Sequence, residues 1–131
     1  MTSVADTRLL LTLQFPPDAT VGDKARVFLQ KELVRGVITP SIVLTEFLKI
    51  AGARIGIQEA IRTISGLKER GMKIRNIDEG LALEAGKLLV RYRNVPIADS
   101  LVAAFTFRQI AEYVLTDDPH FEVLGTRTRW L

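Results

Sequence analysis

The sequence contains no cysteine and only one histidine, His120. Without cysteine the chain cannot form disulfides, thiolate zinc sites or a cysteine nucleophile. A single histidine excludes histidine-rich metal sites, so any bound metal would be a hard cation held by oxygen atoms. The longest apolar run, from Leu9 to Leu13 with a threonine inside, is too short for a signal core or a membrane span. We therefore expect a cytoplasmic protein with no membrane association.

The composition is that of a globular chain. Apolar residues make up 47% of the 131 residues, enough to bury a core without covalent staples, and we expect a single domain over residues 1–131. Basic residues outnumber acidic ones by 18 to 15, and arginine outnumbers lysine by twelve to six. The arginine excess weakly favours phosphate contact, although solvated surface explains most of these charges.

The apolar pattern predicts short buried strands that alternate with amphipathic helices. Strands are expected at residues 3–5, 37–39, 73–77 and 113–116, with one or two more within 121–124 and 127–131. Helices are expected at residues 9–13, from 21 to 35, from Pro40, at 58–70, from 79 to 92 and from Ile97. Alternation of this kind predicts an α/β layered fold with a mostly parallel sheet.

Four acidic residues fall where such a fold would bring them together. Asp6 ends the first strand, Glu46 lies on the helix after the second, Asp99 starts a later helix, and Asp118 follows the strand at 113–116. Open α/β sheets bind ligands outside the carboxyl ends of their strands. Clustered carboxylates raise one another's pKa unless a cation neutralises them, and Mg²⁺ or Mn²⁺ prefers such oxygen ligands. The sequence therefore indicates a metal or phosphate site.

Each acid also has an ordinary explanation when it is taken alone. Asp6 and Asp118 suit turns at strand ends, and Asp99 suits the first turn of a helix, where the helix dipole favours an acid. Glu46 is harder to explain in this way, because an apolar helix face usually rejects a carboxylate. His120 is more often structural than catalytic. Taken together, the four acids make these separate explanations improbable.

With these residues in place, the sequence resembles the PIN-domain nucleases, and among them the toxins of VapBC-type toxin–antitoxin pairs. The resemblance covers essentially the whole chain. It rests on four motifs in order: Val4-Ala5-Asp6-Thr7, the segment from Thr39 to Phe47, the segment from Ile97 to Ala104, and the ending Thr116-x-Asp118-x-x-Phe121. The spacing of the last motif favours Asp118 over its neighbour Asp117 as the metal-site residue.

The resemblance implies a three-layer α/β/α sandwich with a parallel sheet of four or five strands. It also implies a Mg²⁺- or Mn²⁺-dependent endoribonuclease in which an activated water attacks a phosphodiester in line. The substrate would be structured RNA such as tRNA or rRNA, and the partner a small antitoxin. A homodimer would form through the apolar helices between residues 40 and 70. The metal would be held by Asp6, Glu46, Asp99 and Asp118, with Thr116 as a supporting hydroxyl.

One residue departs from the family pattern. Two positions after the first aspartate the family usually has serine or asparagine, and this chain has Arg8. Arg8 cannot support a metal site through a small polar group, although it can reach an RNA phosphate. The departure leaves open a PIN-like interaction domain that has lost catalysis, and a PIN nuclease of RNA maturation is a further alternative. A phospho-acceptor receiver domain fits poorly, because Asp6 stands alone and no lysine follows Lys87.

Overall fold

The computed structural model describes residues 2–131 and consists of short strands joined by helices. Its strands are β1 (Ser3–Ala5), β2 (Val37–Pro40), β3 (Lys73–Arg75), β4 (Tyr113–Leu115) and β5 (Thr128–Arg129). Its helices are α1 (Thr7–Gln14), α2 (Ala19–Arg35), α3 (Ser41–Ile55), α4 (Ile57–Glu69), α5 (Glu79–Arg91), α6 (Ile97–Phe107) and α7 (His120–Leu124).

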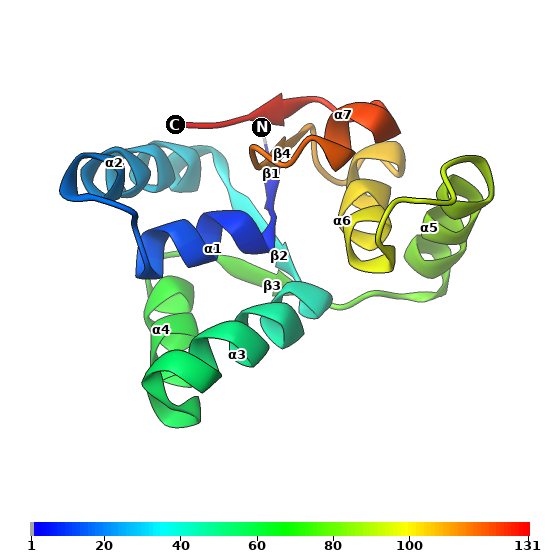
Figure 1. Cartoon of the computed structure of the whole chain (residues 1–131). Helices are drawn as coiled ribbons and strands as arrows, with labels where there is room; N and C mark the ends of the chain where they lie inside the picture. The colour runs from blue at the N-terminus through cyan, green and yellow to red at the C-terminus, as the bar shows by residue number, and fades with distance from the viewer. Residues whose placement is uncertain (1) are drawn as a thin grey trace.

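The five strands form one parallel sheet in the order β3-β2-β1-β4-β5. Val4 at its centre pairs with Ile38 on one side and with Val114 on the other. Parallel neighbours need crossover connections, and the helices provide them. Figure 1 shows α1 and α2 on one side of the central strands and α5 and α6 on the other. The expected α/β fold with a parallel sheet is confirmed.

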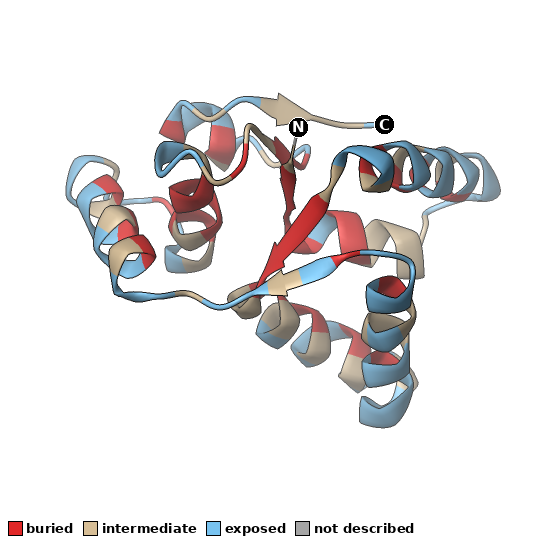
Figure 2. Cartoon of the chain, turned by 180° about the vertical axis from the view of Figure 1, so that it is seen from behind, coloured by how far each residue is buried: buried red, intermediate tan, exposed pale blue. Residues whose placement is uncertain are grey.

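The core lies around the middle strands. All three residues of β1 are buried, as are all four of β2, and the same strands stand out as buried in Figure 2. Strands of a parallel sheet that is covered on both faces are apolar throughout rather than alternating. In the outer strand β3, Lys73 and Arg75 are exposed and Ile74 is half-buried. Polar and apolar residues therefore alternate along this strand because it lies at the edge of the sheet.

Helix ends follow the predicted chemistry closely. Asp78, a favoured capping residue just before the helix expected from residue 79, caps α5 by accepting the backbone N–H of Leu81. Gly36 ends α2 at a φ of 111°, which a residue with a side chain rarely adopts. Asp18 caps α2, which therefore begins at Ala19, two residues before the expected start. The prediction for Pro40 was wrong by one residue, because it ends β2 and α3 starts after it.

Two further expectations were wrong. Residues 121–124 belong to helix α7 instead of a strand, because the Asp118 side chain accepts the backbone N–H of His120 and starts a turn. Phe121 and Leu124 are then both buried, three residues apart on one helix face. On α3, the spacing of Val43, Phe47 and Ile50 in the sequence predicts one buried face, but Ile50 is 40% exposed and does not belong to that face.

Within residues 2–131, no helix combines the length and the hydropathy that a membrane span requires.

Candidate metal centre

The acidic residues gather where the sheet reverses its strand order. From β1 the chain builds outward to β2 and β3, then returns to place β4 on the other side of β1. Open α/β folds bind ligands at such a reversal, outside the carboxyl ends of the strands. Asp6 follows β1, and Thr116 follows β4, at positions set side by side by the pairing of Ala5 with Leu115. The expected juxtaposition of these two strand ends is confirmed.

Thr116 ties the two strand ends together. Its hydroxyl donates a hydrogen bond of 2.9 Å to Asp6 Oδ2 and accepts one of 3.0 Å from the backbone N–H of Asp118. Asp6 is only 3% exposed. Burial raises the pKa of Asp6 from 3.8 to about 7, although the Thr116 hydrogen bond acts in the opposite direction. The nearby charge of Asp99, and to a lesser extent that of Glu46, contributes to this rise.

Asp99 and Asp118 approach each other across the imidazole of His120. Nδ1 of His120 lies 2.9 Å from Asp99 Oδ2 and 3.2 Å from Asp118 Oδ1. One ligand atom from each of the three residues falls within 4.8 Å of the others. Burial raises the pKa of Asp99, and the charge of Asp118 adds to this effect, whereas the hydrogen bond with His120 lowers it. Two carboxylates and a ring nitrogen therefore converge at one point.

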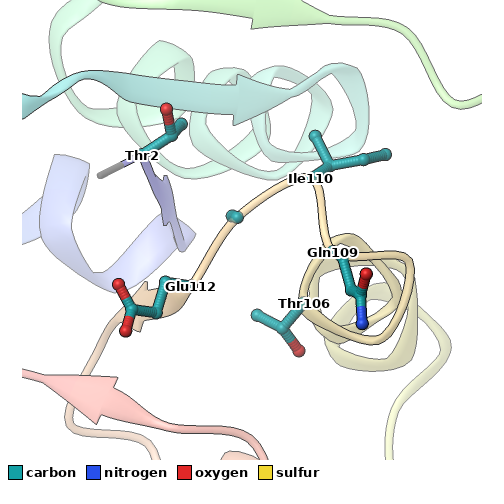
Figure 3. A pocket seen from close by; sticks show the side chains of 6 residues that line it. Thr2, Thr106, Gln109, Ile110 and Glu112 are labelled. Carbon is teal, nitrogen blue, oxygen red and sulfur yellow. The ribbon is translucent and has the colours of Figure 1, made fainter.

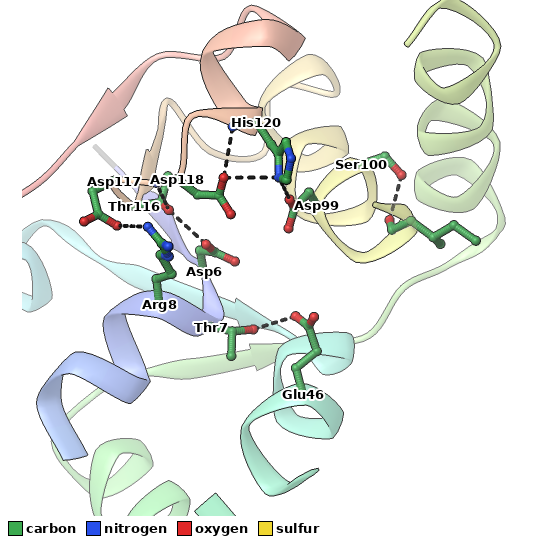
Figure 4. Close-up of polar contacts among 11 residues, drawn as sticks. Asp6, Thr7, Arg8, Glu46, Asp99, Ser100, Thr116, Asp117, Asp118 and His120 are labelled. Atoms are coloured by element: carbon green, nitrogen blue, oxygen red, sulfur yellow. Dashed lines mark hydrogen bonds and ion pairs between the residues drawn. The ribbon is translucent and has the colours of Figure 1, made fainter. Parts of the chain in front are cut away.

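Glu46 reaches the same region from α3. Thr7 at the start of α1 donates a hydrogen bond of 2.6 Å to Glu46 Oε1. Because Thr7 directly follows Asp6, this bond fixes the glutamate beside the buried aspartate. The charge of Glu46 raises the pKa of both Asp6 and Asp99. In Figure 4 the side chains of these acids and of Asp118 face a common space from four different elements.

The donor set fits a hard divalent cation. Four carboxyl groups from distant parts of the chain surround one region, and two of them have raised pKa values. Such crowding is unfavourable without a counter-charge, and carboxylate oxygens are the ligands that Mg²⁺ and Mn²⁺ prefer. Among the described residues, Asp99, Asp118 and His120 are close enough to share one metal ion, and the side chains of Asp6 and Glu46 face the same space.

Arg8 and Asp117 lie at the outer rim of this cluster. Arg8 Nη1 donates to Asp117 Oδ1 over 2.8 Å, and the two side chains are 50% and 46% exposed. The hydrogen bond with Asp117 raises the pKa of Arg8, and the charges of Asp118 and Asp6 act in the same direction. Arg8 therefore pairs directly with Asp117 and also interacts electrostatically with Asp118 and Asp6.

Sequence reasoning missed two members of the cluster. It treated His120 as a structural residue, and only its position two residues after Asp118 signalled otherwise. It gave no role to Thr7, whose contact with Glu46 joins residues 39 positions apart. Neither contact produces a sequence pattern, because each depends on how separate elements pack.

A hollow lies at the opposite end of the sheet from the acidic cluster. It has a volume of about 410 Å³ and is lined by residues including Thr2, Thr106, Gln109 and Glu112, as Figure 3 shows. Thr2 precedes β1 and Glu112 precedes β4, so this hollow lies at the amino ends of the strands. It is therefore separate from the acidic cluster.

Comparison with known proteins identifies the family. The PIN domain family matches residues 4–126, whereas curated protein sequences gave no significant match. A chain of the Rickettsia felis VapBC2 complex bound to promoter DNA has a TM-score of 0.80 at 14% identity, with 99% of this chain and 98% of that chain covered. The sarcin–ricin loop cleaving toxin VapC20 of Mycobacterium tuberculosis has a TM-score of 0.76 at 21% sequence identity, with 95% of each chain covered. A chain of FitAcB from Neisseria gonorrhoeae has a TM-score of 0.69 at 16% sequence identity, with 96% of this chain and 95% of that chain covered. These likenesses establish a shared fold, and the family match over most of its length shows that the chain belongs to the PIN domain family.

Proposed function

We propose that this protein is a metal-dependent endoribonuclease and the toxin of a toxin–antitoxin pair. The observation that carries the proposal is the partly buried acidic cluster at the switch point of the sheet, in which Asp6 has a pKa of about 7. A fold gains nothing structural from burying mutually repelling carboxyl groups, so the cluster is best explained by a cation that it binds.

In this proposal Asp6, Glu46, Asp99 and Asp118 hold Mg²⁺ or Mn²⁺. When bound, the ion supplies Lewis-acid polarisation of the phosphodiester and a water of lowered pKa. The chain's own residues position the acids: Thr116 orients Asp6 through a hydrogen bond, and the backbone N–H of His120 orients Asp118.

The structural neighbours support the choice of substrate and partner in this proposal. The structural neighbour VapC20 is a sarcin–ricin loop cleaving toxin, and several other structural neighbours are toxin–antitoxin complexes. By this likeness we propose structured RNA of the tRNA or rRNA class as substrate and a small antitoxin as partner. Both would be met in the cytoplasm.

A homodimer is also part of the proposal. The helices between residues 40 and 70 carry the exposed apolar side chains of Ile57 and Ile61. Exposed apolar side chains gathered on a surface are typical of protein interfaces. Light scattering of the purified chain tests this point, and we expect a mass of twice 14.6 kDa.

RNA cleavage by an Asp99→Asn variant tests the main proposal. We expect wild-type protein to cleave RNA with Mn²⁺ and to stop when EDTA is added, and the variant to lose this activity with its circular-dichroism spectrum unchanged. Glu79→Gln is the matched control, because Glu79 is an exposed acid in the first turn of α5. Wild-type activity in Asp99→Asn would overturn the site assignment. Copurification of a short partner chain separates a toxin from a nuclease of RNA maturation.

A further inference from the structure

A hollow of about 340 Å³ adjoins the acidic cluster on the side of α1 and α3. Residues of both helices and of the loop after β4 line it: Arg8, Leu11, Thr12, Phe15, Ile50, Arg54 and Asp117. Arg8 and Asp117, which Figure 4 shows beside the acidic cluster, also line this hollow, so the hollow adjoins the rim of the cluster. Its walls combine cationic, aromatic, aliphatic and hydroxyl groups with one acid, whereas carboxylates predominate in the cluster beside it.

The charge of the hollow is positive. Arg8 and Arg54 contribute two cations, and the single acid in the lining, Asp117, pairs with Arg8. A guanidinium carries five N–H donors, and the bond to Asp117 uses one of them at Nη1. The Arg8 side chain is 50% exposed, which leaves it accessible to the oxygens of a phosphate.

The second cation is stacked on an aromatic ring. The guanidinium carbon of Arg54 lies 3.9 Å from the centre of the Phe15 ring. A planar cation on an aromatic face is a stable arrangement that presents a flat surface. Single-stranded nucleic acids stack their bases on such surfaces and place their backbone along positive charge.

From these features we propose that the hollow binds the single-stranded RNA next to the acidic cluster, with Arg8 against a backbone phosphate and the Arg54–Phe15 pair beneath a base. The inference rests on the proposed ribonuclease function and assigns a binding role to Arg8, the residue that departs from the family pattern. A strand that approaches four carboxylates is repelled by them, so a cationic surface next to the cluster is needed to hold it.

RNA binding without cleavage tests this inference. Anisotropy of a fluorescein-labelled single-stranded RNA of mixed sequence is measured in EDTA over a range of salt concentrations. We expect Arg8→Gln and Arg54→Gln each to weaken binding roughly 5-fold, and each lost phosphate contact to reduce the slope of log affinity against log salt by about 0.7. Arg35→Gln is the matched control, because Arg35 is an exposed arginine beside the amino end of β2.

Asp117→Asn should change RNA affinity in the opposite direction from Arg8→Gln. Removing the carboxylate releases Arg8 and removes a negative charge from the hollow, so we expect RNA affinity to rise a few-fold. In an Arg8→Gln background the same substitution should give a smaller gain. A merely structural role of the Arg8–Asp117 pair would make both single variants worse.

The outcomes separate this inference from the proposed function. Binding by wild type that equals that of Arg8→Gln and Arg54→Gln, or no binding by any variant, overturns the RNA subsite. A synthetic acidic peptide serves as a second probe. If Arg8→Gln and Arg54→Gln lose binding to this peptide while their RNA binding is unchanged, the RNA subsite is overturned and the hollow is assigned to a protein partner. Because these measurements contain no metal, they stand whether or not the acidic cluster cleaves RNA.

Discussion

Replacing Asp6 with asparagine should stabilise the metal-free protein. Asp6 is buried, and its pKa rises from 3.8 to about 7 in the folded state. Each pKa unit corresponds to about 1.4 kcal/mol, so holding the ionised carboxylate in the fold costs roughly 4 kcal/mol above neutral pH. Asparagine is neutral at every pH and keeps an oxygen that can accept the hydrogen bond of Thr116.

The pH dependence gives this prediction its sign. Because the folded pKa of Asp6 is raised, the neutral carboxyl stabilises the fold fully below about pH 4, and this contribution is lost as the pH rises through about 7. The stability difference between Asp6→Asn and wild type should therefore be small in acid. It should grow to roughly 4 kcal/mol at about pH 8.

Urea denaturation in EDTA at acidic and alkaline pH measures the difference. Asp23→Asn is the control, because Asp23 is an exposed acid on α2 whose loss should change stability by less than about 1 kcal/mol. Added Mn²⁺ should stabilise wild type more than Asp6→Asn, since the ion relieves the charge that the variant lacks. The reasoning would be refuted if Asp6→Asn were less stable than wild type at alkaline pH. It would also be refuted if the difference in unfolding free energy between the two proteins were the same at both pH values.

Two further substitutions probe the supports of the site and of the sheet. Thr116→Val removes the hydroxyl that links Asp6 to the backbone of Asp118, and cleavage assays should show a roughly 10–100-fold loss of activity with folding retained. Arg129→Ala leaves Glu32, which is 2% exposed, without its 3.2 Å ion pair, and urea unfolding should show a loss of about 3 kcal/mol that Glu32→Gln partly restores.

The order of the elements could be predicted from the sequence because each carries a local signal. The buried strand at Val37 and the capping residue Asp78 are fixed by apolar pattern and helix-start chemistry within a few residues. The start of α2 was misplaced because its cap, Asp18, lies after two prolines that indicated a loop. The segment 121–124 was misread because four residues are too few to distinguish helical from strand spacing.

Only those site residues whose positions follow from the order of the strands could be predicted from the sequence. Asp6 and Asp118 follow strands, and parallel strands that neighbour each other must end together. The hydrogen bond of Arg8 with Asp117 joins residues 109 positions apart, and no sequence pattern indicates it. The place of His120 between two acids likewise depends on how α7 packs against α6, which is a result of tertiary packing.

Calorimetric titration of Mn²⁺ into the purified chain tests the central claim most directly, since the claim is that the acidic cluster is a metal site. We expect wild type to bind Mn²⁺ and Asp118→Asn to bind it much more weakly, with Glu79→Gln binding like wild type. Absence of Mn²⁺ and Mg²⁺ binding by folded wild-type protein would contradict the account and favour a PIN-like interaction domain without catalysis.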